Sequence, residues 1–199
     1  MREYYDKRAP EYDDWYLGRG LYAERDRPGW DEERDSLTRT LEALPPAHTL
    51  DVACGTGFLT RHLPGELTGL DQSPAMLAIA AEQAPRPRFV RGDALALPFP
   101  DGAFDRVFTG HFYGHLETEE RLRFVAEARR VAPELVVVDS ALRDGVAAEE
   151  WQERQVRDGS RFAVYKRYFT AEGLASELGG GEVLHAGRYF VAVQLRSDE

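Results

Sequence analysis

The sequence predicts an α/β fold in which a doubly wound, mostly parallel sheet is followed by a C-terminal antiparallel hairpin. Short apolar segments alternate with amphipathic helical segments through the first two thirds of the chain. Two strand-like segments joined by a turn then close the sequence. Strands that alternate with helices are typical of parallel sheets covered on both faces.

The first half of the chain sets up this alternation. Leu37, Leu41 and Leu44 at helical spacing predict a helix over residues 31–44, which Pro45 and Pro46 end. Helices are also expected over residues 58–63 and from Ser73, which caps the next helix, to about residue 84. The sequence predicts strands over residues 49–53, 67–70, 88–91 and 103–109.

The second half adds a long amphipathic helix over residues 118–131 and an uninterrupted apolar strand over 135–138. Such a run indicates a strand buried on both faces. Further helices are expected over residues 147–156 and, capped by Thr170, over 170–178. Residues 182–185 and 189–195 are predicted to pair as a hairpin around Gly187.

The length of 199 residues fits a single domain, and no linker or repeat divides it. We expect one domain over residues 1–199, with an aromatic and charged N-terminal arm over 1–30. A cofactor-binding core is expected over 48–140, and an insertion that borders an acceptor pocket over 141–170.

Composition excludes several classes of function. The net charge of −10 disfavours a nucleic-acid partner. Cys54 is the only cysteine, so no intrachain disulfide forms, which fits the cytoplasm. The N-terminus lacks the apolar stretch of a signal peptide, and no apolar run is long enough to span a membrane. The oligomeric state is left open.

A glycine-rich turn follows the first predicted strand. Gly55 and Gly57 allow a tight bend and a close approach of a ligand to the backbone. A bare structural turn is the alternative, but the order of strand, acid, Gly-x-Gly and helix favours a nucleotide-like ligand. The dinucleotide fingerprint needs a third glycine at position 60, where this chain has Thr60, and this argues against a nicotinamide cofactor.

A second acid, Asp71, ends the second predicted strand. A carboxylate there can accept charge-assisted hydrogen bonds from two ribose hydroxyls. The alternative is that Asp71 only caps the helix that follows.

Three segments together make the sequence similar to the class I S-adenosylmethionine-dependent methyltransferases. It most resembles their small-molecule branch of the ubiquinone and menaquinone biosynthesis type. The glycine-rich motif matches at residues 50–57, the ribose motif at 69–77, and the adenine motif with the fourth strand at 92–105. The resemblance covers about residues 48–110. It implies a Rossmann-like, seven-stranded sheet, S-adenosyl-L-methionine as cofactor, and methyl transfer to a small-molecule acceptor by direct displacement.

The same resemblance implies roles for individual residues. Residues near the first motif would face the methionine part of the cofactor, those after the second strand its ribose, and those after the third its adenine. Tyr12, in the N-terminal arm, would fold over the cofactor. The alternative is that this part of the arm is an ordinary surface helix. The expected cofactor-binding residues are Tyr12, Asp51, Ala53, Cys54, Gly55, Gly57, Asp71, Gln72, Met76, Asp93, Ala94 and Leu95.

His111 is the candidate catalytic residue, because it follows the fourth strand, where ligands bind in such sheets. It would orient or deprotonate an acceptor, and a purely structural histidine is the alternative. His111, His115, Asp139 and His185 lack the spacing of a metal-binding helix, so we expect no metal.

A basic and aromatic cluster after the fifth strand is the candidate wall of an acceptor pocket. It would suit an anionic or aromatic acceptor, although a solvated charged face is the alternative. Its members are Trp151, Arg154, Arg157, Arg161, Tyr165, Lys166, Arg167 and Tyr168.

Two other functions remain open at this point. A methyltransferase-like protein that binds the cofactor without turnover would carry the same motifs. A nicotinamide-dependent oxidoreductase would need glycine at position 60 and would leave Asp93 unexplained.

Overall fold

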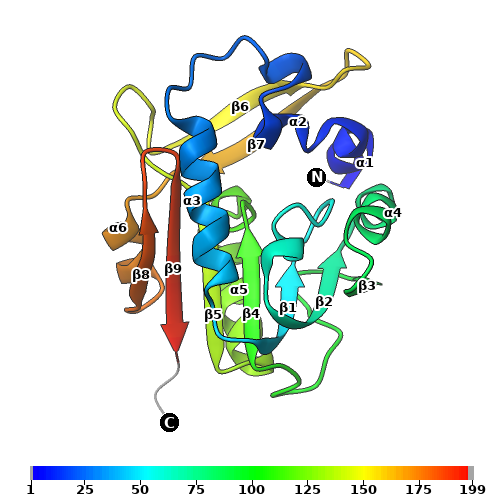
Figure 1. Cartoon of the computed structure of the whole chain (residues 1–199), viewed down its shortest axis with the longest axis vertical. Coiled ribbons are helices and arrows are strands. Elements are labelled where there is room, and N and C mark those ends of the chain that lie inside the picture. The colour runs from blue at the N-terminus through cyan, green and yellow to red at the C-terminus, as the bar shows by residue number, and fades with distance from the viewer. Residues whose placement is uncertain (1, 197–199) are drawn as a thin grey trace.

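In the computed structural model, which describes residues 2–196, a seven-stranded sheet lies between layers of helices (Figure 1). Neighbouring strands are parallel from β3 to β5, and β9 runs antiparallel to both β5 and β8. The predicted mostly parallel sheet with its C-terminal hairpin is therefore confirmed. The strand order is β3 (Arg88–Arg91), β2 (Gly65–Asp71), β1 (Ala47–Val52), β4 (Arg106–Gly110), β5 (Glu134–Ser140), β9 (Phe190–Arg196) and β8 (Glu182–Ala186).

The α-helices that cover the sheet begin and end close to where the sequence predicts. They are α3 (Trp30–Glu42), α4 (Pro74–Gln83), α5 (Thr118–Val131) and α6 (Ala171–Glu177). Ser73 caps α4 by accepting from the backbone N–H of Met76, and Thr170 caps α6 by accepting from that of Gly173. Within the part of the chain that the structure describes, no helix is long and apolar enough to cross a membrane.

Two predicted helices are wrong. Residues 147–156 form a strand, β6 (Glu149–Gln155), paired antiparallel with β7 (Arg161–Arg167) as a separate two-stranded ribbon. Glu, Gln and Arg favour helix locally, but pairing with a distant segment outweighs that preference. Residues 58–63 form only a 3-10 turn, η3 (Thr60–His62), because Pro64 and Gly65 leave too little chain for an α-helix.

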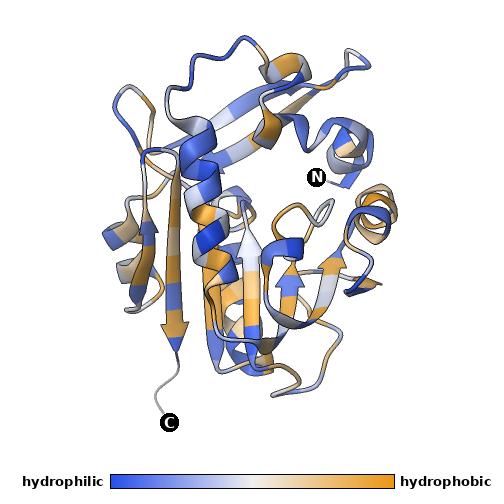
Figure 2. Ribbon diagram, viewed as in Figure 1, coloured by the Kyte–Doolittle hydropathy of each residue, from blue (hydrophilic) through white to orange (hydrophobic). Residues whose placement is uncertain are grey.

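Apolar side chains fill both faces of the sheet. β5 contributes Leu135 and Val137 to one core cluster and Val136 and Val138 to the other. This alternation confirms that the uninterrupted apolar run is a strand buried on both faces. Figure 2 shows hydrophobic residues concentrated along the central strands and polar ones toward the surface.

The N-terminal arm lies above the C-terminal ends of the parallel strands, beside the β6–β7 ribbon (Figure 1). Tyr4 of the arm packs with Val156 and Val164 of the ribbon in a small third core. The arm and the ribbon therefore form one cover over the edge of the sheet where ligands bind. The arm consists of α1 (Arg2–Arg8), η1 (Ala9–Glu11), α2 (Asp14–Leu17) and η2 (Gly20–Tyr22).

Candidate functional site

A cavity of about 290 Å³, called the first cavity below, opens at the C-terminal ends of β1, β2 and β4. All three motif segments contribute to its lining, although they are separate in the sequence. Of the thirteen predicted site residues, ten line it: Tyr12, Ala53, Gly55, Asp71, Gln72, Met76, Asp93, Ala94, Leu95 and His111.

Asp71 connects the two loops that border the first cavity. One carboxylate oxygen accepts from the backbone N–H of Gly55 at 2.9 Å and the other from that of Ser73 at 2.8 Å. Burial raises the pKa of this carboxyl, and these backbone hydrogen bonds oppose the rise. Since Ser73 caps α4, the capping alternative for Asp71 is wrong. Each oxygen keeps a lone pair for a ligand.

Asp51 lies beneath the first cavity, beside a small void that Tyr12, Ala53 and Cys54 also line. One of its oxygens accepts from the Thr60 hydroxyl at 2.5 Å, and the other is buried without a hydrogen-bond partner. Burial raises the pKa of Asp51 to about 8; the Thr60 hydrogen bond lowers it and the charge of Asp71 raises it. Thr60, which breaks the dinucleotide fingerprint, therefore orients this carboxylate.

Cys54 and Gly57 do not line the first cavity. The Cys54 side chain points toward β2, where its sulfur would be 3.0 Å from a Cβ added at Gly69. Burial raises the pKa of its thiol well above the usual value, which keeps it protonated. Gly57 has a φ of +76° and faces α4, so its function is to shape the turn.

The remaining walls of the first cavity are largely apolar. Leu70 and Met76 lie on one side, and Phe112 and Leu116 from the loop after β4 lie on another. The sequence did not single out Phe112 or Leu116, because neither belongs to a motif. An apolar slot with carboxylates at its ends suits a flat aromatic ring carrying polar substituents.

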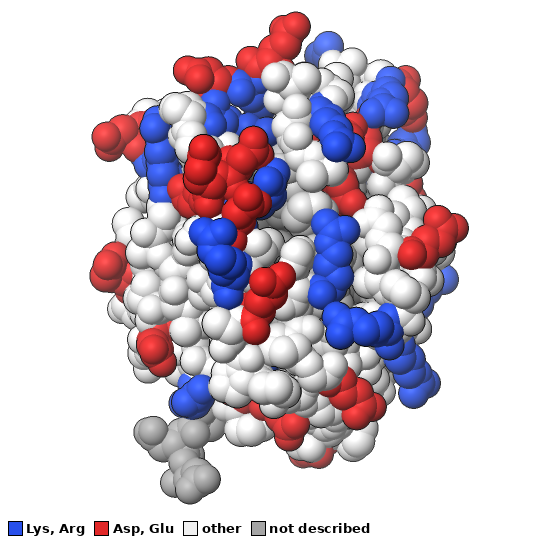
Figure 3. Space-filling view, in the orientation of Figure 1, with Lys and Arg blue, Asp and Glu red and all other residues white. Residues whose placement is uncertain are grey.

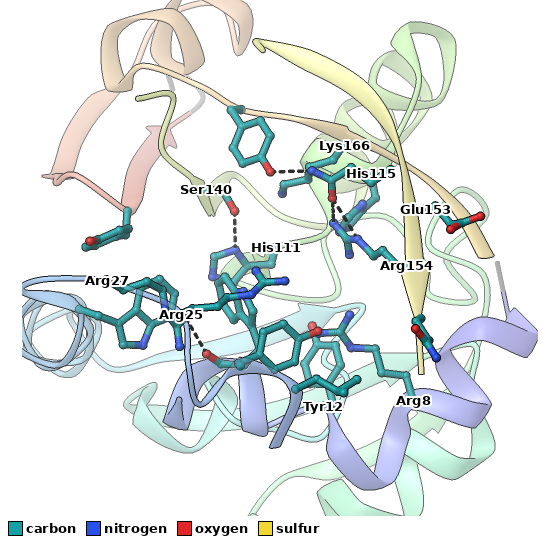
Figure 4. Close-up of a pocket in the computed structure, with 18 of the residues that line it drawn as sticks. Arg8, Tyr12, Arg25, Arg27, His111, His115, Ser140, Glu153, Arg154 and Lys166 are labelled. Atoms are coloured by element: carbon teal, nitrogen blue, oxygen red, sulfur yellow. Dashed lines mark hydrogen bonds between the residues drawn. The ribbon is translucent and has the colours of Figure 1, made fainter. Parts of the chain in front are cut away.

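A second cavity of about 490 Å³ lies between the arm, the loop after β4 and the ribbon. Tyr5, Tyr12, His111 and His115 line both cavities, so these four side chains form their common wall. Figure 4 shows Tyr12 from the arm and His111 from the loop after β4 among the side chains that line the second cavity.

His111 occupies a strained position in this wall, with a φ of +57°. Its Nδ1 lies 3.5 Å from the Ser140 hydroxyl and 4.0 Å from a carboxylate oxygen of Asp139, while its Nε2 has no partner in the described structure. Burial lowers the pKa of His111 to about 4, although the charge of Asp139 opposes the change. His111 is therefore neutral at physiological pH.

A buried ion pair supports the loop that carries His111. Lys166 of β7 donates to Asp139 of β5, and both side chains are almost completely buried. The other Asp139 oxygen accepts from the backbone N–H of Gly114 at 2.7 Å. The pair thus joins the ribbon, the sheet and the loop after β4.

The arm is fastened to both sides of the site. Asp6 accepts from the Ser73 hydroxyl at 2.5 Å, and Asp13 accepts from the Thr56 hydroxyl at 2.5 Å. On the ribbon side, Glu11 accepts from the backbone N–H of Arg157. The Tyr12 ring packs against Gly55, where an added Cβ would be 3.5 Å away.

The basic and aromatic cluster is only partly at the site. Arg154, Lys166 and Tyr168 line the second cavity. Trp151 does not, because it is 63% exposed and contacts Tyr165 instead. Arg157, Arg161 and Arg167 do not line it and form ion pairs instead, Arg157 with Glu11, Arg161 with Glu153 and Arg167 with Glu177.

Several cavity residues were missed by sequence reasoning. Arg25 and Arg27 of the arm and Arg143 after β5 line the second cavity, as does Arg8. Arg8, Arg25 and Arg27 lie close to tyrosines or Trp30 in the sequence, which is a signal that could have marked them, whereas Arg143 has no such neighbour. Among the described residues, His111, His115, Asp139 and His185 join no group of three potential metal ligands.

The known proteins that the chain resembles in sequence include several methyltransferases. Residues 50–134 match the methyltransferase domain family. The chain is 51% identical over 71 residues to demethylmenaquinone methyltransferase from Thermus thermophilus, covering 31% of this chain and 32% of that protein. It is 30% identical over 178 residues to ajmaline N-methyltransferase from Rauvolfia serpentina, covering 75% and 60%. The chain thus spans a third to three fifths of the length of these relatives.

Among solved structures, the fold is similar to that described as the DhpI-SAM-HEP complex. The TM-score is 0.76 at 25% sequence identity, and the match covers 98% of this chain and 94% of that one. This similarity includes the arm and the ribbon as well as the sheet, since it extends over nearly the whole chain.

Proposed function

We propose, from the premise that the chain belongs to the class I S-adenosylmethionine-dependent methyltransferases, that it binds this cofactor in the first cavity and methylates a small molecule held in the second. The observation that carries the proposal is the common wall of Tyr5, Tyr12, His111 and His115. Because these four residues line both cavities, the cavities adjoin, and ligands bound in the two would lie next to each other without bulk water between them.

The residues of the first cavity, together with Asp51 beneath it, fit the cofactor. The unpartnered oxygen of buried Asp51 suits the ammonium group of the methionine part. Asp71 keeps acceptors for the two ribose hydroxyls, and the slot beside Met76, Phe112 and Leu116 suits the adenine ring. Bound there, S-adenosylmethionine supplies a methyl group already activated on a sulfonium sulfur.

The protein's own contribution is then positioning and exclusion of water. Tyr12, held by the arm, covers the glycine-rich turn and lies between the first cavity and the second. His111 has an unpartnered Nε2 in the common wall, so it would orient an acceptor group as a neutral imidazole. In this proposal residues 1–30 act as a lid and 141–170 border the acceptor, within one domain over 1–199. Residues 1 and 197–199 lie outside the described structure.

Two alternatives are less well supported. A nicotinamide cofactor would meet Thr60 where its fingerprint has glycine, and Thr60 instead holds Asp51. Binding without turnover would leave the second cavity without a purpose.

Acidic and basic side chains are interspersed over the face in Figure 3, which gives no support for a nucleic-acid partner. The single cysteine supports a cytoplasmic location.

The function is tested first by cofactor binding. We expect S-adenosylmethionine and S-adenosylhomocysteine to bind in calorimetry, and NAD not to bind. A folded protein that binds neither adenosyl ligand would refute the proposal. Turnover is tested separately by release of S-adenosylhomocysteine with a library of acceptors.

Cofactor affinity should rise with pH between about pH 6 and 8. With a pKa of about 8, buried Asp51 carries a proton at pH 7, and an ammonium ligand favours the ionised form. The free protein then binds more protons than the complex, so binding releases protons in this range. Calorimetry of S-adenosylhomocysteine in two buffers of different ionisation enthalpy measures the release.

The matched variants are Asp51→Asn and Asp93→Asn. Asp51→Asn should abolish the proton release. It should also weaken binding about 10- to 100-fold, because a charge-assisted hydrogen bond contributes about 1.5–3 kcal/mol. Asp93 is exposed, so its variant should keep the proton release. Equal proton release in wild type and Asp51→Asn would show that Asp51 is not the group that titrates.

A further inference from the structure

We propose that the acceptor is a small acid, and that its ionised oxygen receives the methyl group to form an ester. This inference rests on the proposed function and specifies the chemistry of its second substrate. Cations without acidic partners concentrate in the second cavity, although the chain as a whole has a net charge of −10.

Five arginines line the second cavity, and within residues 2–196 none of them has a carboxylate oxygen within 4.0 Å. They are Arg8, Arg25, Arg27, Arg143 and Arg154. The acid in the described lining is Glu153, which pairs with Arg161 at 3.0 Å instead. Lys166 is neutralised by Asp139. An anionic ligand would therefore find several unneutralised guanidinium groups in one cavity.

Arg8 is the most informative of these arginines, because it is only 7% exposed. The other buried arginines have acidic partners: Arg106 pairs with Glu134 and Arg121 with Glu177. Arg8 instead donates to the Tyr4 hydroxyl, and its Nε has no partner in the described structure. A buried guanidinium without a counter-ion is costly, so an anionic ligand would supply the missing partner.

Arg8 and Arg154 also place this anion near the common wall. The Arg8 guanidinium lies over the Tyr12 ring, 5.3 Å from its centre. Burial raises the pKa of Tyr5, and the nearby charges of Arg154 and Arg8 oppose the rise. In Figure 4, Arg8 and Arg154 approach Tyr12 from one side, and Arg25 and Arg27 lie on the other. The acid group itself, rather than a remote part of the acceptor, would thus face the first cavity.

Neither histidine of the common wall has a pKa suited to a general base. Burial lowers the pKa of His111 to about 4 and that of His115 well below its usual value, and His115 is already bonded to the carbonyl of Tyr165 at 2.7 Å. An effective general base has a pKa near the working pH. An acceptor that has lost its proton before it binds needs no such base.

The proposed step balances without proton transfer. The ionised oxygen gives an electron pair to the methyl carbon, and the carbon–sulfur bond breaks with its pair on sulfur. The products are a methyl ester and a neutral thioether. Because opposite charges are neutralised, a cavity shielded from water favours the reaction, and arginines on the other oxygens of the acid keep it in place.

Binding to protein saturated with S-adenosylhomocysteine tests the acceptor class. The probes are benzoate and phenylphosphonate, with neutral benzamide as the control. We expect at least one acid to bind at least about 10-fold more tightly than benzamide in calorimetry. If the protein binds S-adenosylhomocysteine but neither acid better than benzamide, the inference is wrong and the proposed function stands. Failure to bind S-adenosylhomocysteine would instead refute the proposed function.

Variants assign the anion to its residues. Arg8→Gln and Arg154→Gln should each weaken binding of the acid about 10-fold or more and leave affinity for S-adenosylhomocysteine within about twofold. Arg154 is half-buried on the ribbon, so its variant keeps the test valid if Arg8→Gln fails to fold. Arg123→Gln, at an exposed position of α5 outside the cavity, is the matched control and should change nothing. Acid binding that is unchanged in both cavity variants would overturn the assignment.

The transfer step is tested with a donor carrying a deuterated methyl group. With the donor saturating at each pH, the acid that binds should appear as its labelled methyl ester in mass spectrometry, at a rate that does not fall between pH 8 and pH 6. Aniline and phenol are offered as alternative acceptors. If either of them receives the labelled methyl group and neither acid does, the acceptor atom is not an ionised acid oxygen.

Discussion

Lys166→Met should lower the free energy of unfolding by about 3–5 kcal/mol at pH 7, the cost of removing one partner of a buried ion pair. Its partner Asp139 is fully buried, and two backbone N–H groups, of Gly114 and Ser140, donate to it. Burial alone would raise the pKa of Asp139, but the charge of Lys166, that of His111 once it is protonated at low pH, and the hydrogen bonds from Lys166 and the Ser140 N–H hold it below its usual value. Without Lys166 the carboxylate is left charged and uncompensated. Urea denaturation measures the change.

The dependence on pH separates this effect from lost packing. In the wild type, the lowered pKa of Asp139 contributes stability that is present above the unfolded value of about 3.9 and lost as the pH falls through the folded pKa. In Lys166→Met burial raises the pKa of Asp139, so its neutral form relieves the penalty as the pH falls. The difference in the free energy of unfolding between wild type and Lys166→Met should therefore become smaller as the pH falls from about 7 to about 5.

Two further variants complete the comparison. Arg161→Met, on the same strand, removes an exposed ion pair with Glu153 and should cost no more than about 1 kcal/mol. Asp139→Asn combined with Lys166→Met should recover much of the loss, since no charge remains buried. A Lys166→Met protein as stable as Arg161→Met at pH 7 would contradict the role of the pair.

The parts of the fold that the sequence predicts correctly depend on local signals. The helix over residues 118–131 carries its own amphipathic pattern and is capped by Glu117 and Glu120. The ribbon depends instead on pairing between segments. Trp151 lies opposite Tyr165, and in isolation the strand over 149–155 consists mainly of residues that favour helix. Single-sequence reasoning has no access to that partner.

The same division applies to the site. That most of the motif residues gather around the first cavity was predictable, because each motif directly follows a strand and parallel strands end at one edge of the sheet. The acceptor side was not predictable in detail. Arg8 and Arg154 lie far apart in the sequence and line one cavity only because the arm packs on the ribbon. The Asp139–Lys166 ion pair likewise joins β5 to β7, and neither residue belongs to a sequence motif.

Asp71→Ala should weaken binding of S-adenosylhomocysteine at least about 100-fold. Loss of charge-assisted hydrogen bonds to the ribose costs about 1.5–3 kcal/mol, which is about 10- to 100-fold in affinity. The variant also leaves the N–H groups of Gly55 and Ser73 without their acceptor. The glycine-rich turn and the start of α4 then lose the group that holds them at a fixed separation. The effect should therefore reach or exceed the upper end of that range.

The matched control for Asp71→Ala is Asp93→Ala at the adenine end of the same cavity. Asp93 is exposed and accepts one backbone hydrogen bond, from Leu95 at 2.9 Å, so its loss should weaken binding by no more than about 10-fold. Calorimetry gives both dissociation constants, and thermal unfolding verifies that each variant is folded. Equal losses in the two variants would mean that Asp71 acts only as one carboxylate among several. An unchanged dissociation constant in folded Asp71→Ala would mean that Asp71 serves the turn alone and that the ribose is bound elsewhere.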